Sequence, residues 1–155
     1  MTLPVWMLLG FATWTVLLLL ATVGLYRWSR ILTGRVPISV FRADEIEGKD
    51  WYKRSIRTHA NCVENLPVFG AIVFALYAGD VANATVNVLT VVILAARIMQ
   101  SLVHVCLVQT NMVVSVRFGF FFVQIVSFLW LVAIIVVTLG SSAQPSFQES
   151  LILEA

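Results

Sequence analysis

Four apolar stretches, each long enough to cross a lipid bilayer, occupy most of this chain. A helix of about 20 apolar residues spans the roughly 30 Å hydrocarbon layer of a membrane. Hydrophobic residues make up 60% of the 155 residues and charged residues only 12%, against about 45–50% and about 25% in soluble domains. A soluble fold of this length could not hide so much apolar surface. We therefore predict an all-α integral membrane protein, a four-transmembrane-helix bundle that forms a single domain over residues 1–155.

Turn residues and the onset of charge indicate where these helices end. Gly79 and Asp80 end the second helix, and Gly140 ends the fourth. The predicted helices cover about 4–26, 50–79, 85–108 and 113–139, with a cytoplasmic loop over about 27–49 and a mobile tail over 141–155.

Basic residues are concentrated in one part of the chain. Eight of the ten Lys and Arg residues lie between Arg27 and Arg57. Because cytoplasmic loops are enriched in Lys and Arg, this loop belongs in the cytoplasm and both termini lie on the other side. A nucleic-acid role would want a basic face with exposed aromatic platforms, whereas this basic block lies beside a membrane. We expect membrane lipids as partners and no nucleic acid.

Polar residues recur at helical spacing inside two of the apolar stretches. Separations of three and four residues place side chains on one face of a helix. A charged residue at the centre of a bilayer costs about 2.5–3.5 kcal/mol on insertion scales, so it usually marks a functional site. The residues are Arg54, Arg57, Asn61 and Glu64 in the second helix, and Arg97, Gln100 and His104 in the third.

These polar residues are expected to share the cytoplasmic half of the membrane. The second helix leaves the cytoplasm and the third returns to it, while Arg117 opens the fourth helix there, and Arg27 and Arg30 close the first. Simpler readings stay open. Arg117 could extend to the membrane surface, Glu64 could pair with an arginine, and His104 could be an interior residue with no role in chemistry.

The residue types in this set indicate the kind of ligand. Several arginines favour carboxylates or phosphates, which they bind in a bidentate way. One glutamate and one asparagine among them suggest that the ligand also presents an ammonium or amide group, as a small zwitterion would. One histidine and one carboxylate fall short of a metal-ligand set. Cys62 and Cys106 have no C-x-x-C spacing, so no metal is expected.

The segment from Arg57 to Phe69 contains the pattern R-x-x-x-N-x-x-E-x-x-P and resembles the signature of the MAPEG family, the membrane-associated proteins in eicosanoid and glutathione metabolism. The resemblance covers nearly the whole chain. It includes the four helices, the basic first loop, Arg97 in the third helix and Arg117 at the start of the fourth. It is most similar to bacterial members, so a bacterial inner membrane is the expected location.

This resemblance implies a homotrimer with glutathione as co-substrate, bound between neighbouring subunits. Arg117 would stabilise the glutathione thiolate, and a nearby cation raises the thiolate fraction. The implied family contacts are Arg57, Asn61 and Glu64, with Arg30 or Arg27 from the adjacent subunit. The full set of candidate glutathione-binding residues is Arg27, Arg30, Arg54, Arg57, Asn61, Glu64, Arg97 and Gln100, and the candidate catalytic residues are Arg117 and His104.

Gln100 and His104 stand where family enzymes often carry tyrosines. Either residue could hydrogen-bond the ligand, and His104 could act as a base. The main hypothesis is a glutathione transferase or peroxidase acting on lipophilic electrophiles from the bilayer. The alternative is a non-catalytic member that binds a lipid or thiol ligand or serves as an accessory subunit. A small multidrug exporter would want an acidic residue in the first helix, and none occurs there.

Overall fold

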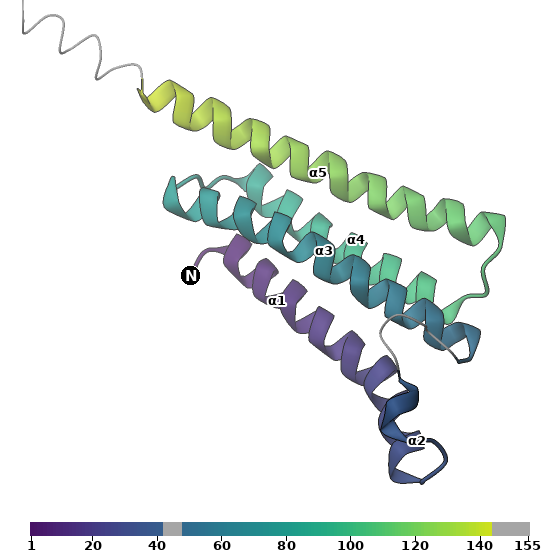
Figure 1. The fold of residues 1–155 in the computed structure, drawn as a ribbon. Coiled ribbons are helices and arrows are strands. Elements are labelled where there is room, and N and C mark those ends of the chain that lie inside the picture. The colour runs from purple at the N-terminus through teal and green to yellow at the C-terminus, as the bar shows by residue number, and fades with distance from the viewer. Residues whose placement is uncertain (42–47, 144–155) are drawn as a thin grey trace, which may run out of the picture.

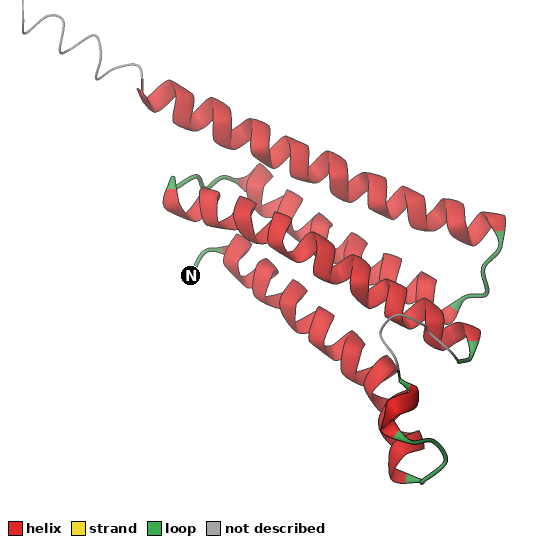
Figure 2. Ribbon diagram, viewed as in Figure 1, coloured by secondary structure: helices red, strands yellow, loops and turns green. Residues whose placement is uncertain are grey.

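Four helical runs, each long and apolar enough to cross a membrane, dominate the computed structural model, which describes residues 1–41 and 48–143. The four spans are Leu3–Leu32, Asp50–Ala78, Ala84–Cys106 and Asn111–Ser141, and Figure 2 shows only helices and loops in the described part. The prediction of an all-α, four-helix transmembrane protein is confirmed. The elements are α1 (Leu3–Leu18), the π-helical η1 (Leu19–Gly24), α2 (Leu25–Leu32), the short 3-10 helix η2 (Ile38–Val40), α3 (Asp50–Ala78), α4 (Ala84–Cys106) and α5 (Asn111–Ala143).

The first helical run is longer than predicted. It continues through η1 and α2 to Leu32, so Arg27 and Arg30 lie on a helix and not in a loop (Figure 1). The onset of charge marks where the chain meets the membrane surface, whereas the helix itself ends only where the backbone must turn. Gly34 supplies that turn with a φ of 64°, and its N–H donates to the carbonyl of Ile31 at 3.0 Å.

The last helix is also longer than predicted at both ends. It begins at Asn111 and passes through Gly140 to Ala143, because one glycine inside a helix costs only about 1 kcal/mol. The hydroxyl of Ser141 donates a hydrogen bond to the carbonyl of Val137 at 2.6 Å. Its hydrogen-bond partner therefore lies within the same helix. The predicted mobile tail therefore cannot begin at residue 141, and its part from residue 144 lies outside the described residues.

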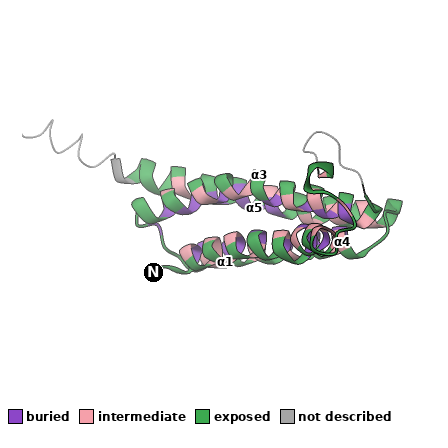
Figure 3. Cartoon of the chain, turned by 60° about the horizontal axis from the view of Figure 1, so that its bottom comes forward, coloured by how far each residue is buried: buried purple, intermediate pink, exposed green. Residues whose placement is uncertain are grey.

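Aromatic side chains hold α1, α3 and α5 together in the middle of the bundle. The ring of Phe69 lies between those of Phe11 and Phe128, with centroid separations of 5.6 and 6.0 Å. Outside this core, many large apolar side chains stay exposed along the helices (Figure 3). An apolar outer surface of this extent fits a chain whose solvent is lipid.

A second aromatic cluster joins α2 to the start of α3. The rings of Tyr26 and Tyr52 stack at 4.2 Å, and Arg27 Nε donates to the Tyr52 hydroxyl at 2.7 Å. Gly48 allows this approach, because a Cβ there would lie 2.9 Å from the Tyr52 ring and 3.0 Å from the Tyr26 hydroxyl. We call this end of the bundle, which also carries the loop between α4 and α5, the basic end.

Candidate functional site

A cavity of about 790 Å³ opens at the basic end, between the start of α3, the end of α4 and the start of α5. Its volume lies within the range of about 300–1,000 Å³ that is usual for small-molecule sites. We call it the outer cavity, and it is lined by Asp50, Lys53, Arg54, Arg57, Ala60, Asn61, Glu64, His104, Val108, Gln109 and Arg117.

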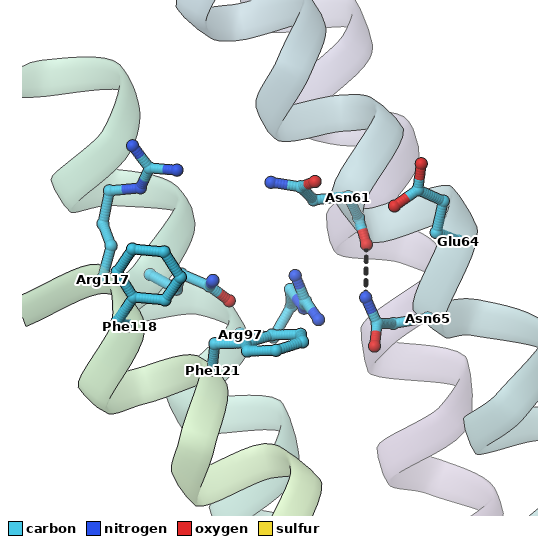
Figure 4. A pocket seen from close by; sticks show the side chains of 8 residues that line it. Asn61, Glu64, Asn65, Arg97, Arg117, Phe118 and Phe121 are labelled. Carbon is cyan, nitrogen blue, oxygen red and sulfur yellow. Dashed lines mark hydrogen bonds between the residues drawn. The ribbon is translucent and has the colours of Figure 1, made fainter. Parts of the chain in front are cut away.

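A smaller cavity of about 250 Å³ lies deeper between the same three helices. Three residues, Asn61, Glu64 and Arg117, line both cavities, so the two spaces meet at these side chains. We call the deeper one the inner cavity, and Figure 4 shows it from close by. Its lining residues are Asn61, Glu64, Asn65, Arg97, Gln100, Arg117, Phe118 and Phe121.

The sequence of α3 explains why its polar residues face these cavities. Tyr52, Ser55 and Cys62 follow one another at helical spacing and are fully buried on another face of α3. The hydroxyl of Ser55 donates to the carbonyl of Trp51 at 2.8 Å, so it needs no partner from another helix. With that face turned inward, the stripe that begins at Arg54 and ends at Glu64 turns toward α4 and α5.

Arg97 is the most deeply buried cation of the described chain, with 1% of its surface exposed. Its Nε and Nη2 atoms have no hydrogen-bond partner among the residues that the structure describes. The guanidinium carbon lies 5.5 Å from the centroid of the Phe11 ring, and the Ser101 hydroxyl donates to the Arg97 carbonyl at 2.8 Å. Burying the donors of a charged group without acceptors is costly, so these two nitrogens are a candidate for contact with a ligand.

Two other arginines also have a buried side-chain nitrogen without a hydrogen-bond partner. Arg54 Nε and Arg117 Nε are also buried, and neither has a hydrogen-bond partner within residues 1–41 and 48–143. Both residues line the outer cavity. Three guanidinium groups with unused donors around one pair of cavities are suited to an anionic ligand, because guanidinium donors match carboxylate and phosphate oxygens.

A buried amide pair supports the inner cavity from α5. Gln124 is fully buried, and its Nε2 donates to Gln100 Oε1 at 2.9 Å and to the Phe120 carbonyl at 3.1 Å. Gln124 was not among the residues predicted from the sequence. Its separation of seven residues from Arg117 places both on one face of α5, two turns apart, and this spacing could have identified it.

Similarity to a known protein family shows to which family this four-helix chain belongs. The model of the MAPEG family matches residues 5–137. The chain belongs to the MAPEG family. The match includes all residues that line the two cavities, and no curated protein gives a significant match. The predicted membership is confirmed, while the expected similarity to bacterial MAPEG members stays a prediction.

The MAPEG chain brings together most of the predicted site residues in one place. Arg54, Arg57, Asn61, Glu64, His104 and Arg117 line the outer cavity, and Arg97 and Gln100 line the inner one. Asn65, Phe118 and Phe121 also line the inner cavity and were not predicted from the sequence. The two phenylalanines stand in an apolar helix where nothing in the sequence distinguishes them from lipid-facing residues, and Asn65 follows Asn61 by one turn.

Arg27 and Arg30 of this MAPEG chain line neither cavity. Arg27 is held by Tyr52 and lies 5.4 Å from the centroid of the Phe41 ring. The guanidinium of Arg30 lies 4.6 Å from the Tyr26 ring centroid. Their expected contribution from an adjacent subunit concerns a neighbouring copy and stays a prediction.

The described residues contain no group of three or more His, Cys, Asp or Glu side chains that could hold a metal ion. Cys62 is buried, Cys106 is exposed, and both are free thiols. Cys62 Sγ lies 3.6 Å from the Ser101 hydroxyl, so it joins α3 to α4 beside Arg97.

Proposed function

We propose that this MAPEG protein is a membrane glutathione transferase or peroxidase, which uses glutathione from the outer cavity to conjugate or reduce lipophilic electrophiles. The observation that supports this best is the lining of the outer cavity, which brings together Arg54, Arg57 and Arg117 and two carboxylates, Asp50 and Glu64. Glutathione has two carboxylates, one ammonium group and one thiol, and this lining complements each of them. The family itself is concerned with eicosanoid and glutathione metabolism, which agrees with this ligand.

The residues divide the work of binding and activation. Arg54 and Arg57 bind the glutathione carboxylates, Asn61 donates or accepts one hydrogen bond, and Glu64 binds the ammonium group. Arg117 lies where the two cavities meet, so it can stabilise the thiolate at the entrance of the inner cavity. In the transferase reaction the thiol loses its proton, and the thiolate sulfur forms a bond to the electrophilic carbon as the leaving group departs.

His104 offers a second way to remove the thiol proton. It is buried and lines the outer cavity together with Arg117. A histidine within reach of a thiol can act as a general base near neutral pH. In this proposal Arg117 stabilises the thiolate, and His104 is the candidate base that accepts the thiol proton.

Assembly and orientation belong to the same proposal. The basic end faces the cytoplasm by the positive-inside rule, where glutathione is available, and both termini lie on the opposite side of a bacterial inner membrane. Three copies form a homotrimer, in which α2 of one copy brings Arg27 or Arg30 toward the outer cavity of the next. Both arginines lie on α2, which begins as the continuation of the first transmembrane run.

A titration on the purified protein in detergent tests the proposal. Glutathione binding is measured by calorimetry, the bound thiolate by its ultraviolet absorbance against pH, and turnover with a chlorodinitrobenzene. Absence of glutathione binding would refute the proposal. Binding without a thiolate near neutral pH, and without turnover, would favour the non-catalytic alternative, which the replacement of family tyrosines by Gln100 and His104 already supports in part.

A further inference from the structure

The segment from Leu25 to Phe41 has exposed apolar and basic side chains, and it lines neither cavity. We propose that this segment, together with Lys49, is a binding surface for anionic phospholipids of the leaflet at the basic end. Arg35 and Lys49 contact the phosphate groups, and Trp28 and Leu32 pack beside the acyl chains. We call this set of residues the lipid surface. It lies on the outside of the bundle and does not depend on glutathione chemistry.

The depth of α2 in the membrane is the first observation. The first helical run, Leu3–Leu32, has 30 residues and is about 45 Å long at 1.5 Å per residue. The hydrocarbon layer is about 30 Å thick, and the bilayer with its headgroups is about 40–45 Å thick. A stretch of about 20 residues from Leu3 therefore crosses the hydrocarbon before α2 begins at Leu25. The residues of α2 lie at the level of the headgroups, at the far end of this run (Figure 1).

One face of α2 is apolar and exposed. Separations of three and four residues place Leu25, Trp28 and Leu32 on one side of the helix, and their side chains are exposed by 66%, 60% and 78%. Tyr26 is buried and stacks on Tyr52, so the apolar face turns away from α3. Tryptophan is enriched at membrane interfaces, and the apolar face of an interfacial helix inserts among lipids. This face therefore suits the boundary between headgroups and acyl chains.

Basic residues lie at the same level on two sides of α2. The backbone N–H of Arg35 donates to the carbonyl of Arg30 at 3.1 Å, so Arg35 starts from the last turn of the helix. Lys49 directly follows Gly48, where a Cβ would lie 3.0 Å from the Tyr26 hydroxyl. Arg35 and Lys49 are both exposed, and neither forms an ion pair with a residue that the structure describes. Phosphate oxygens are suitable acceptors for both side chains.

The charge of this part of the chain favours an anionic headgroup over a zwitterionic one. Residues 1–43 contain no Asp or Glu. Over residues 27–53 there are six Lys or Arg residues and four Asp or Glu residues, so the net charge is +2 with every acidic residue counted. Each Lys or Arg beside a membrane span strengthens the attraction to anionic lipid about fivefold. Because Arg27 and Arg30 are assigned to the proposed glutathione site, the lipid surface rests on Arg35 and Lys49.

Native mass spectrometry of the full chain in mixed micelles measures the preference. Phosphatidylglycerol is the anionic probe, and phosphatidylcholine with the same acyl chains is the zwitterionic reference. From an equal mixture, the wild-type protein should retain phosphatidylglycerol in at least about 20-fold excess. Arg35→Gln and Lys49→Gln should each lower this preference about fivefold, whereas Arg35→Lys keeps the charge and should keep the preference.

A matched control separates a local surface from the overall charge of the protein. Arg35→Gln lowers the net charge by one, and Asp80→Asn raises it by one at the opposite end of the bundle, in the turn between α3 and α4. The double variant has the net charge of the wild type, but it should lose as much preference as Arg35→Gln alone. Arg35, Lys49 and Asp80 are exposed, so none of these substitutions removes a buried side chain.

A fluorescence measurement tests the depth of α2 directly. The protein is reconstituted in phosphatidylglycerol that carries bromine either near the headgroup end or near the methyl end of its acyl chains. The chain has five tryptophans, so the signal of Trp28 is taken as the difference between wild type and Trp28→Phe. Bromine near the headgroup end should quench Trp28, and bromine near the methyl end should quench it less. A Trp28 that neither lipid quenches would place α2 in water and overturn the inference.

The lipid measurements have equally definite opposite results. Equal retention of the two lipids by the wild type, an unchanged preference in both Arg35→Gln and Lys49→Gln, or a preference restored by Asp80→Asn would each refute the lipid surface. Glycerophosphoglycerol is the headgroup without acyl chains, and it should not displace the bound lipid at equal concentration; displacement would show a site for soluble phosphates instead. Glutathione binding should be unchanged in Arg35→Gln, because Arg35 lines neither cavity. A loss of glutathione affinity there would assign Arg35 to the glutathione site and overturn the inference, while absence of glutathione binding in the wild type would refute only the proposed function.

Discussion

Replacing Glu64 by glutamine tests the assignment of the glutathione ammonium group most directly. Glu64→Gln keeps the size and shape of the side chain, removes its charge and replaces one acceptor oxygen by an NH2 group. Glu64 is exposed and has no ion pair within the described residues, so the substitution leaves no buried group without its partner. The free energy of unfolding should therefore change by less than about 0.5 kcal/mol, and any effect on binding can be assigned to the ligand.

The expected magnitude follows from the kind of hydrogen bond that the substitution weakens. A hydrogen bond to a charged partner contributes about 1.5–3 kcal/mol, which corresponds to a decrease of about 10- to 150-fold in the affinity for glutathione. Glutaryl-cysteinylglycine is glutathione without its amino group, and its affinity for the wild-type protein should be lower by a similar factor. In Glu64→Gln the two ligands should bind about equally, because each change removes the same charged pair and the two effects do not add.

Calorimetric titration of both ligands into both proteins gives the complete cycle. Asp80→Asn is the matched control, because Asp80 is an exposed carboxylate in the turn between α3 and α4. It lines neither cavity. Its φ of 50° is one that asparagine adopts readily. If the folded Glu64→Gln protein binds glutathione within about threefold of wild type, or still distinguishes the two ligands fully, Glu64 does not bind the ammonium group.

Three further predictions concern thiolate chemistry, a buried charge and assembly. Arg117→Ala should raise the thiol pKa of bound glutathione and lower activity at neutral pH about tenfold or more, and this loss should become smaller as the pH rises. The ultraviolet absorbance of the thiolate against pH measures the shift. His104→Phe should have a comparable effect only if His104 takes the proton from the thiol. Arg97→Met should raise the stability of the ligand-free protein by about 1 kcal/mol or more in thermal unfolding, because it removes a buried charge whose Nε and Nη2 have no hydrogen-bond partner among the described residues. A large loss of stability would show that Arg97 is satisfied internally. Native mass spectrometry in detergent should give a trimer of the 17.2 kDa chain, whereas monomers alone would remove a site shared between subunits.

The fold could be predicted from the sequence because a bilayer leaves few alternatives. Backbone polar groups must be satisfied inside each span, so four long apolar stretches can only become helices of about that length. The ends of the helices could not be predicted as well. Arg27 and Arg30 continue the first run as α2 because helix formation does not stop at the membrane surface, and Gly140 did not end α5.

The candidate site could be predicted where polar residues contrast with an apolar background. Arg97, Gln100 and the stripe on α3 stand out in this way, and the structure places them around two joined cavities. Phe118 and Phe121 do not stand out, because apolar residues in an apolar helix carry no signal of the direction they face. Which direction each faces depends on how α5 packs against α4, and that is a property of the assembled bundle.

The two cavities also bear on why a charge as costly as Arg97 can be kept within a membrane helix. Two donor atoms of its guanidinium, Nε and Nη2, are buried without a hydrogen-bond partner among the described residues, which lowers the stability of the empty protein. In the proposed function, an anionic ligand beside Arg97 would recover part of that loss only when it is bound. An apolar residue at position 97 would remove the cost, but it would also remove this contribution to binding. A site that is stable only when filled is therefore the expected consequence of a cation at this depth.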